Sequence, residues 1–250
     1  MNTKPFLFSV LMLAACGKPE NTADKKETKK QDTRFWKNPD KDIPEKFTKH
    51  VDELVSQSGA QKEGEKELSY TLNYLDKETL KTLNSGELLY YCLAYPAAYN
   101  QNCSIDAGDT VKAKIARYLP DQFCAHHMST LQNTLLERNR DSVILLLNGY
   151  IEKHPGKTDV AYLTVVRNLQ AVECIPSVIE TASNENCYNY TLLANLLTGY
   201  RPFLATGMYT KLYGYGDDVM VHNVRIEASK ENVKRLCDLA MKMYNEQKIQ

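Results

Sequence analysis

The chain has 250 residues, with 31 basic and 31 acidic side chains and 43% hydrophobic residues. This length is enough to bury the core of one domain or of two small ones. The balanced charge creates no overall field that would attract nucleic acid or anionic lipid, so we expect no nucleic-acid partner.

The first 16 residues have the pattern of an export signal. Lys4 precedes an apolar run of about ten residues from Phe6 to Ala15, and small residues lead up to Cys16. The run is too short to cross a bilayer, which needs about 20 residues. We therefore expect residues 1–15 to be a signal peptide. The alternatives are an ordinary secretory signal with a chance cysteine, or an apolar first helix of the fold.

The end of this run, Leu13-Ala14-Ala15-Cys16, resembles the lipobox of bacterial lipoproteins. The resemblance implies that the Cys16 thiol is diacylated, for example with palmitate, that the preceding peptide is removed, and that the new amino terminus is often acylated too. Two or three acyl chains hold a protein stably on a bilayer. Gly17, instead of Asp, favours the outer over the inner membrane if the organism has one. The expected place is the bacterial cell envelope, on the periplasmic or outer side.

Residues 16–42 are predicted to be the lipidated cysteine and a flexible tether. Large apolar side chains are missing from this segment until Phe35 and Trp36, and such a sequence cannot bury enough surface to fold. Its lysines could touch lipid headgroups or cell-wall polymer, although acidic neighbours favour a solvated spacer. Phe35 and Trp36, the only Trp of the chain, could pack back onto the domain.

Helical signals dominate residues 43–250, which we expect to be a single domain. Apolar residues recur at helical spacing in segment after segment, with candidate caps such as Ser85, Asp109, Asp159 and Ser229. The predicted helices run from Pro44 to Gly59, over 67–75 and 77–83, from Ser85 to Tyr95, from Asp109 to Leu119, and over 124–135, 143–151, 159–169, 171–181, 188–197 and 229–244.

The predicted fold class is all-α. The elements suggest either a multi-helix bundle or a short helical stack of HEAT or TPR type, since helices come in pairs every 30–45 residues or so. Residues 207–226 break the helical pattern. Within them, Val219 to Ile226 is rich in β-branched residues and could form one short extended segment.

That irregular segment is the candidate binding loop. Its candidate residues are Tyr213, Tyr215, Asp217, Asp218 and His222. Adjacent carboxylates with a nearby histidine could hold a cation. The alternative is a tyrosine-rich turn packed between two helices.

Six further cysteines follow Cys16, and export would place them in an oxidising compartment. Two pairs lie close along the chain, Cys92 with Cys103 and Cys174 with Cys187, and are candidate disulfides. Cys124 and Cys237 would then be paired with each other or remain buried thiols. The alternative is that most of the six are small buried apolar residues.

No motif of a known reaction occurs in the sequence. Cys124 and His127 stand three residues apart and could share a metal ion on a helix, but no second ligand pair appears, so we predict no metal site and no cofactor. We also predict no catalytic residue. The first hypothesis is a non-catalytic interaction module that binds an envelope protein or a cell-wall partner. The second is an envelope-polymer hydrolase or cation-binding protein with a site near Asp217, Asp218 and His222.

Overall fold

The computed structural model describes residues 43–58, 69–71, 74–95, 97–101, 114–119, 124–185, 187–214 and 225–248; of residues 69–71, 98–101 and 124–127 it describes the backbone alone. The chain divides into two units, residues 1–33 and 34–250, and every described residue belongs to the second. The predicted signal peptide, Cys16 and the tether lie outside the described residues.

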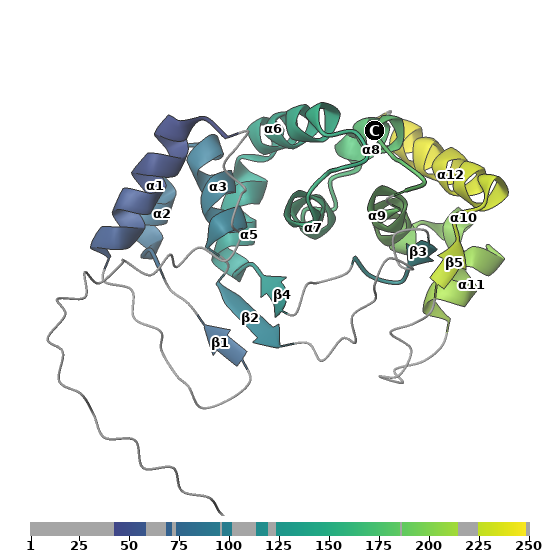
Figure 1. The fold of residues 1–250 in the computed structure, drawn as a ribbon, viewed down its shortest axis with the longest axis horizontal. Helices are drawn as coiled ribbons and strands as arrows, with labels where there is room; N and C mark the ends of the chain where they lie inside the picture. The colour runs from purple at the N-terminus through teal and green to yellow at the C-terminus, as the bar shows by residue number, and fades with distance from the viewer. Residues whose placement is uncertain are drawn as a thin grey trace, which may run out of the picture. The chain divides into compact units, whose positions relative to one another are not determined.

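The described part of the chain is built mainly of helices, which confirms the all-α class (Figure 1). Two short 3-10 helices, Val172–Cys174 and Leu197–Gly199, accompany the α-helices. The α-helices are α1 Glu45–Gln57, α2 Lys77–Thr82, α3 Ser85–Ala94, α5 Thr130–Arg138, α6 Arg140–Lys153, α7 Val160–Asn168, α8 Ile175–Glu180, α9 Tyr188–Leu196, α10 Arg201–Leu204, α11 Gly207–Tyr213 and α12 Lys230–Lys248.

The helices from α6 onward pack in two layers (Figure 1). In one layer α6 packs on α8, and α8 packs on α12; in the other α3 packs on α7, and α7 packs on α9. The helices α6, α7, α8 and α9 therefore alternate between the layers along the chain. This alternation is what a helical stack predicts, because each helix is covered by its neighbours in sequence and by the next pair.

The centre of the domain consists of helices that are buried on nearly all sides. All residues of α3 from Gly86 to Ala94 are buried, and so are all residues of α9 from Asn189 to Leu196. The sequence predicted this for α3, because a helix without a polar face must be surrounded by other elements. No helix in the described ranges combines the length and the apolar character needed to cross a bilayer.

The predicted helix starts are largely correct. Asp159 caps α7 by accepting from the backbone N–H of Ala161, and the Ser229 hydroxyl accepts from the N–H of Asn232 in α12. For α3 the cap is Asn84, one residue before the predicted Ser85. The Asn84 side chain accepts from the N–H groups of Gly86 and Glu87, which completes a capping box and leaves Ser85 as the first helical residue.

Short strands among the described residues are the main departure from the sequence prediction. Strands β1 (Ser69–Thr71), β2 (Ala98–Gln101) and β4 (Cys124–His127) form one antiparallel sheet in the order β1-β2-β4, and β3 (Lys114–Ala116) pairs with β5 (Arg225–Glu227). The helices predicted over 67–75 and 109–119 are therefore wrong where the chain is described, and the helix predicted from Cys124 begins only at Thr130. Asp109 lies outside the described residues.

The strands escaped prediction because their partners are distant in sequence. Ile115 pairs with Ile226, and Tyr99 pairs with His126. A three-residue strand has too few positions to show an alternating pattern of its own. The predicted extended segment near 219–226 agrees with β5 at residues 225 and 226, while residues 219–224 lie outside the described part.

The predicted irregular segment from residue 207 is also partly wrong. Residues Gly207–Tyr213 form α11, and the Thr206 hydroxyl caps this helix by accepting from the N–H of Tyr209. Met208 and Leu212 are buried one turn apart. Two apolar anchors in seven residues are enough for a helix that docks on a core, but they are too few to be recognised by periodicity alone.

Candidate interaction site

An apolar groove lies between α1 and α6, which both pack on α3. We call it the α1–α6 groove; its volume is about 130 Å³. Phe47 of α1 forms one wall, and Leu145, Leu146 and Gly149 of α6 form the other. Because α1 and α6 both pack on the buried helix α3, the positions of the two walls are fixed by the same helix.

Two glycines shape the groove in different ways. A Cβ on Gly86 of α3 would come within 2.8 Å of the Phe47 ring, so only glycine lets that ring lie directly on α3. A Cβ on Gly149 would meet no atom within 4 Å. The absence of a side chain at Gly149 therefore leaves open space between α6 and the groove, and a methyl group at this position would not clash with another atom.

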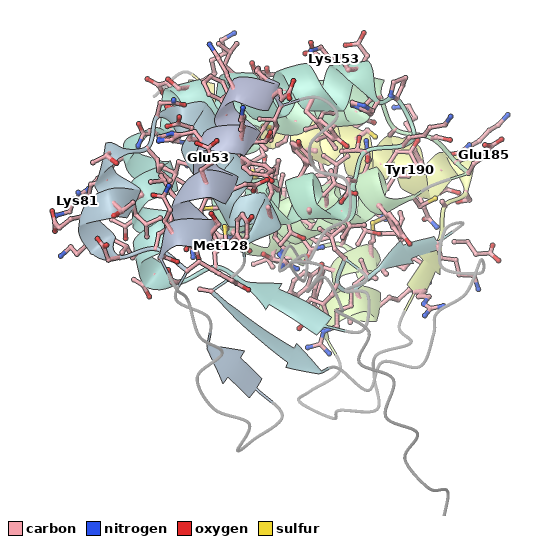
Figure 2. The ribbon with its side chains drawn as sticks, turned by 60° about the vertical axis from the view of Figure 1, so that its left-hand side comes forward. Glu53, Lys81, Met128, Lys153, Glu185 and Tyr190 are labelled. Carbon is pink, nitrogen blue, oxygen red and sulfur yellow. The ribbon has the colours of Figure 1, made fainter. Side chains whose placement is uncertain are left out.

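The α7 side of the groove is aromatic. Tyr162 of α7 is buried, and its ring stacks on Tyr150 of α6 with centroids 3.4 Å apart and planes 1° from parallel. Tyr150 also stacks on His154, with centroids 4.2 Å apart. Stacked rings offer a rigid surface that an apolar or aromatic group can cover at low entropic cost. Lys153, the exposed last residue of α6, supplies a positive charge at the rim (Figure 2).

Two leucines of α6 face solvent at the groove. Leu145 is 75% exposed and Leu146 is 37% exposed, whereas Val143 and Leu147 of the same helix are fully buried. Leu146 lies three residues after the buried Val143 and so follows the same helical spacing, yet it is only partly covered. Both α1 and α6 pack on α3, and the groove lies between them.

A polar cluster fixes α1 to α3 beside the groove. The Tyr90 and Tyr95 hydroxyls donate hydrogen bonds of 2.9 and 2.6 Å to Oδ1 of Asp52. Nδ1 of His50 lies 2.7 Å from Oε1 of Glu87 in α3. The partly buried Asp52 thus joins the outer helix to two buried rings, and the wall that carries Phe47 is anchored at several points.

A second hollow, about 510 Å³ and wide open, lies beside α5 and the end of α7. Most of the residues that line it have polar or charged side chains, among them Asn133, Glu137 and Asn168. Arg140 closes the neighbouring surface with ion pairs of 2.8 Å to both Glu137 and Glu173. Partial burial opposes ionisation of Glu173, but the hydrogen bonds and the charge of Arg140 outweigh it and lower the pKa of that carboxyl. This network ties α6 to its neighbours, and its charges are satisfied by one another.

The predicted disulfides are not found among the described residues. Cys92, Cys174, Cys187 and Cys237 all carry free thiols, and the first three are buried. The candidate bond between Cys174 and Cys187 is therefore not formed, while Cys103, the candidate partner of Cys92, lies outside the described residues. Burial raises the pKa of the Cys174 thiol to about 12 and also raises the pKa of Cys92. These residues act as small apolar core residues, the alternative weighed from sequence.

The predicted binding loop is described only at its first member. The Tyr213 hydroxyl donates to the backbone carbonyl of Arg117 at 3.0 Å, so the ring bridges α11 and the segment after β3. Burial raises the pKa of Tyr213. Tyr213 is thus the last residue of a helix and packs against the segment after β3, and it does not lie in a turn between two helices. Tyr215, Asp217, Asp218 and His222 lie outside the described residues.

The cysteine and histidine considered for metal binding, Cys124 and His127, lie on β4 and not on a helix. The helical spacing that brought them together in the sequence argument therefore does not apply. Within the described ranges, no group of three or more His, Cys, Asp or Glu residues is placed to hold a metal ion.

Comparisons with known proteins give no further guide to this site. No family model, no curated protein and no solved structure matches the chain. The amino-acid sequence did not lead us to predict the α1–α6 groove. The signals in the sequence were a glycine in the middle of a strong helical run and three successive leucines, Leu145 to Leu147, which cannot all lie on one helix face.

Proposed function

We propose that this protein is a membrane-anchored lipoprotein of the bacterial cell envelope whose helical domain is a non-catalytic interaction module. The observation that carries the anchor is the sequence Leu13-Ala14-Ala15-Cys16, placed after a short apolar run and before a polar segment. Acyl chains on Cys16 would hold the domain at a bilayer, with the outer membrane favoured where there is one.

The α1–α6 groove supports the second part of the proposal. Its walls are apolar, and an exposed leucine pair borders it. Exposed apolar surface that continues into a preformed hollow is a feature of sites that take up a segment of polypeptide. The partner class that fits is an envelope protein offering one large apolar side chain, because the hollow has room for about four water molecules and not for a folded element.

The anchor is tested by labelling cells with a fatty-acid probe that can be detected after purification. The wild-type protein is expected to carry the label and to fractionate with membranes, and Cys16→Ser is expected to lose both. Ser9→Ala, in the predicted signal peptide, is the matched control and should keep both. An unlabelled wild-type protein, or a Cys16→Ser variant that stays in the membrane, overturns the anchor.

The interaction is tested by cross-linking in the native envelope. Leu145→Glu places a charge at the most exposed groove leucine, whereas Leu204→Glu places the same charge on an exposed leucine of α10. Cross-linked partners that are lost with Leu145→Glu and kept with Leu204→Glu support an interaction at the groove. An identical set of cross-links in both variants contradicts it.

A further inference from the structure

We propose that the α1–α6 groove is occupied by Phe35 and Trp36 of the same chain, so that the segment before α1 folds back and covers the exposed leucines of α6. The inference concerns the groove of the proposed function and names its resting occupant. It does not depend on lipidation of Cys16, and its test uses purified protein.

The chain enters the described domain at the groove. Ile43 and Pro44, the first described residues, line the groove themselves. Pro44 has an extended backbone with φ −50° and ψ 130° and precedes the first turn of α1. The segment that comes before Ile43 therefore joins the described domain at the groove wall.

The segment before α1 contains few apolar side chains. Between residues 17 and 42 the apolar side chains are Ala23, Phe35 and Trp36, and the rest are polar, charged, Gly or Pro. Two adjacent large rings in a charged segment would gain most from an apolar surface within reach, because aromatic side chains bury more area than other residues.

The chain between Trp36 and Ile43 is short. Trp36 is seven residues from Ile43, a span of at most about 25 Å when fully extended. The intervening Asn38-Pro39-Asp40 is a turn-forming sequence, which allows the chain to reverse before α1. A reversal at this point brings residues 35 and 36 back alongside the helix that starts at Glu45.

The size and the lining of the groove suit an aromatic side chain. The hollow of about 130 Å³ holds a single large side chain, and its α7 side is the parallel stack of Tyr150 and Tyr162. Gly149 leaves space on α6 where any larger residue would intrude. A second ring can lie along the 75% exposed Leu145 at the edge.

Trp36 is the only Trp, so its fluorescence reports this contact directly. Full-length protein is purified in detergent, and Trp emission and quenching by acrylamide are measured, with urea-unfolded protein as the exposed reference. The proposal expects blue-shifted emission and slow quenching in the wild type. Gly149→Leu, whose Cβ meets no atom within 4 Å and whose longer side chain would take up space in the hollow, and Leu146→Glu are expected to move both readouts to the values of the unfolded reference.

Leu204→Glu is the matched control, because Leu204 is 39% exposed and Leu146 is 37% exposed. It should leave the emission unchanged, and circular dichroism confirms that each variant is folded. Exposed Trp36 in the wild type, or emission unaffected by both groove variants, overturns the proposal. A blue shift that is lost on dilution also overturns it, because the occupant would then be Trp36 of a second copy.

Discussion

The central helix α9 and the outer helix α6 are both rich in leucine, yet they meet different surroundings. In α9 the residues from Asn189 to Leu196 are buried, because α7, α8 and α12 all pack on it. In α6 the leucines Leu145 and Leu146 remain exposed beside a hollow. Apolar character alone therefore does not separate a core residue from a binding residue. What separates them is whether neighbouring elements reach that face.

The largest expected difference is between leucines of these two helices. Leu192→Ala in α9 should lower the free energy of unfolding by about 2–5 kcal/mol, because it leaves a cavity in a closed core. Leu145→Ala should lower it by much less, since the described elements leave that side chain mostly exposed and its proposed cover is a single ring of Phe35 or Trp36 at the edge of the groove. Urea unfolding followed by circular dichroism measures the free energy of unfolding of both variants. Equal losses would contradict the difference between a buried leucine of α9 and an exposed leucine of α6.

The next effect tests how firmly the groove wall is attached. Asp52→Ala removes the acceptor of the Tyr90 and Tyr95 hydroxyls and should cost about 2 kcal/mol, because a charged acceptor is lost and two hydroxyls must find other partners. Glu53→Ala, at the next position and on the exposed side of α1 (Figure 2), is the control and should be nearly neutral. If both variants unfold at the same urea concentration, the tyrosine contacts do not secure α1.

The two groove glycines should respond with opposite signs. Gly86→Ala is expected to destabilise the domain by about 1 kcal/mol, because its Cβ would push the Phe47 ring off α3. Gly149→Ala should stabilise it by up to about 1 kcal/mol, because alanine favours the helix and the added Cβ meets no atom within 4 Å. Thermal unfolding measures both changes, and a Gly149→Ala variant that is destabilised as much as Gly86→Ala would contradict the opposite signs.

The smallest effect concerns the other end of α6, where Arg140 pairs with Glu173. Because the pKa of Glu173 is lowered in the folded protein, its contribution to stability is present above the ordinary value of 4.5 and is lost as the pH falls through the folded value. Glu173→Gln should remove part of this loss on acidification. Glu180→Gln, an exposed carboxyl of α8, is the control. Parallel pH profiles for wild type and Glu173→Gln would show that the pair adds no stability.

Local patterns predicted the helices well where the segment was long or capped. Helices α6, α7, α9 and α12 lie close to their predicted bounds, because each has an apolar stripe or a cap that is readable within a few residues. The strands β3 and β5 could not be predicted in this way, since the paired residues Ile115 and Ile226 lie far apart in the sequence. The candidate loop residues of the sequence analysis are described only at Tyr213, so the second functional hypothesis stays a prediction.

By itself, the sequence determined the helical class, the charged segment before the domain and the central position of α3, because composition and periodicity act over distances of a few residues. The tertiary structure decided that Cys174 and Cys187 are separate buried thiols and that α1 and α6 leave a groove over Gly86. Both outcomes depend on which helices pack against which. That choice is made by contacts between residues far apart in the chain, which no local pattern records.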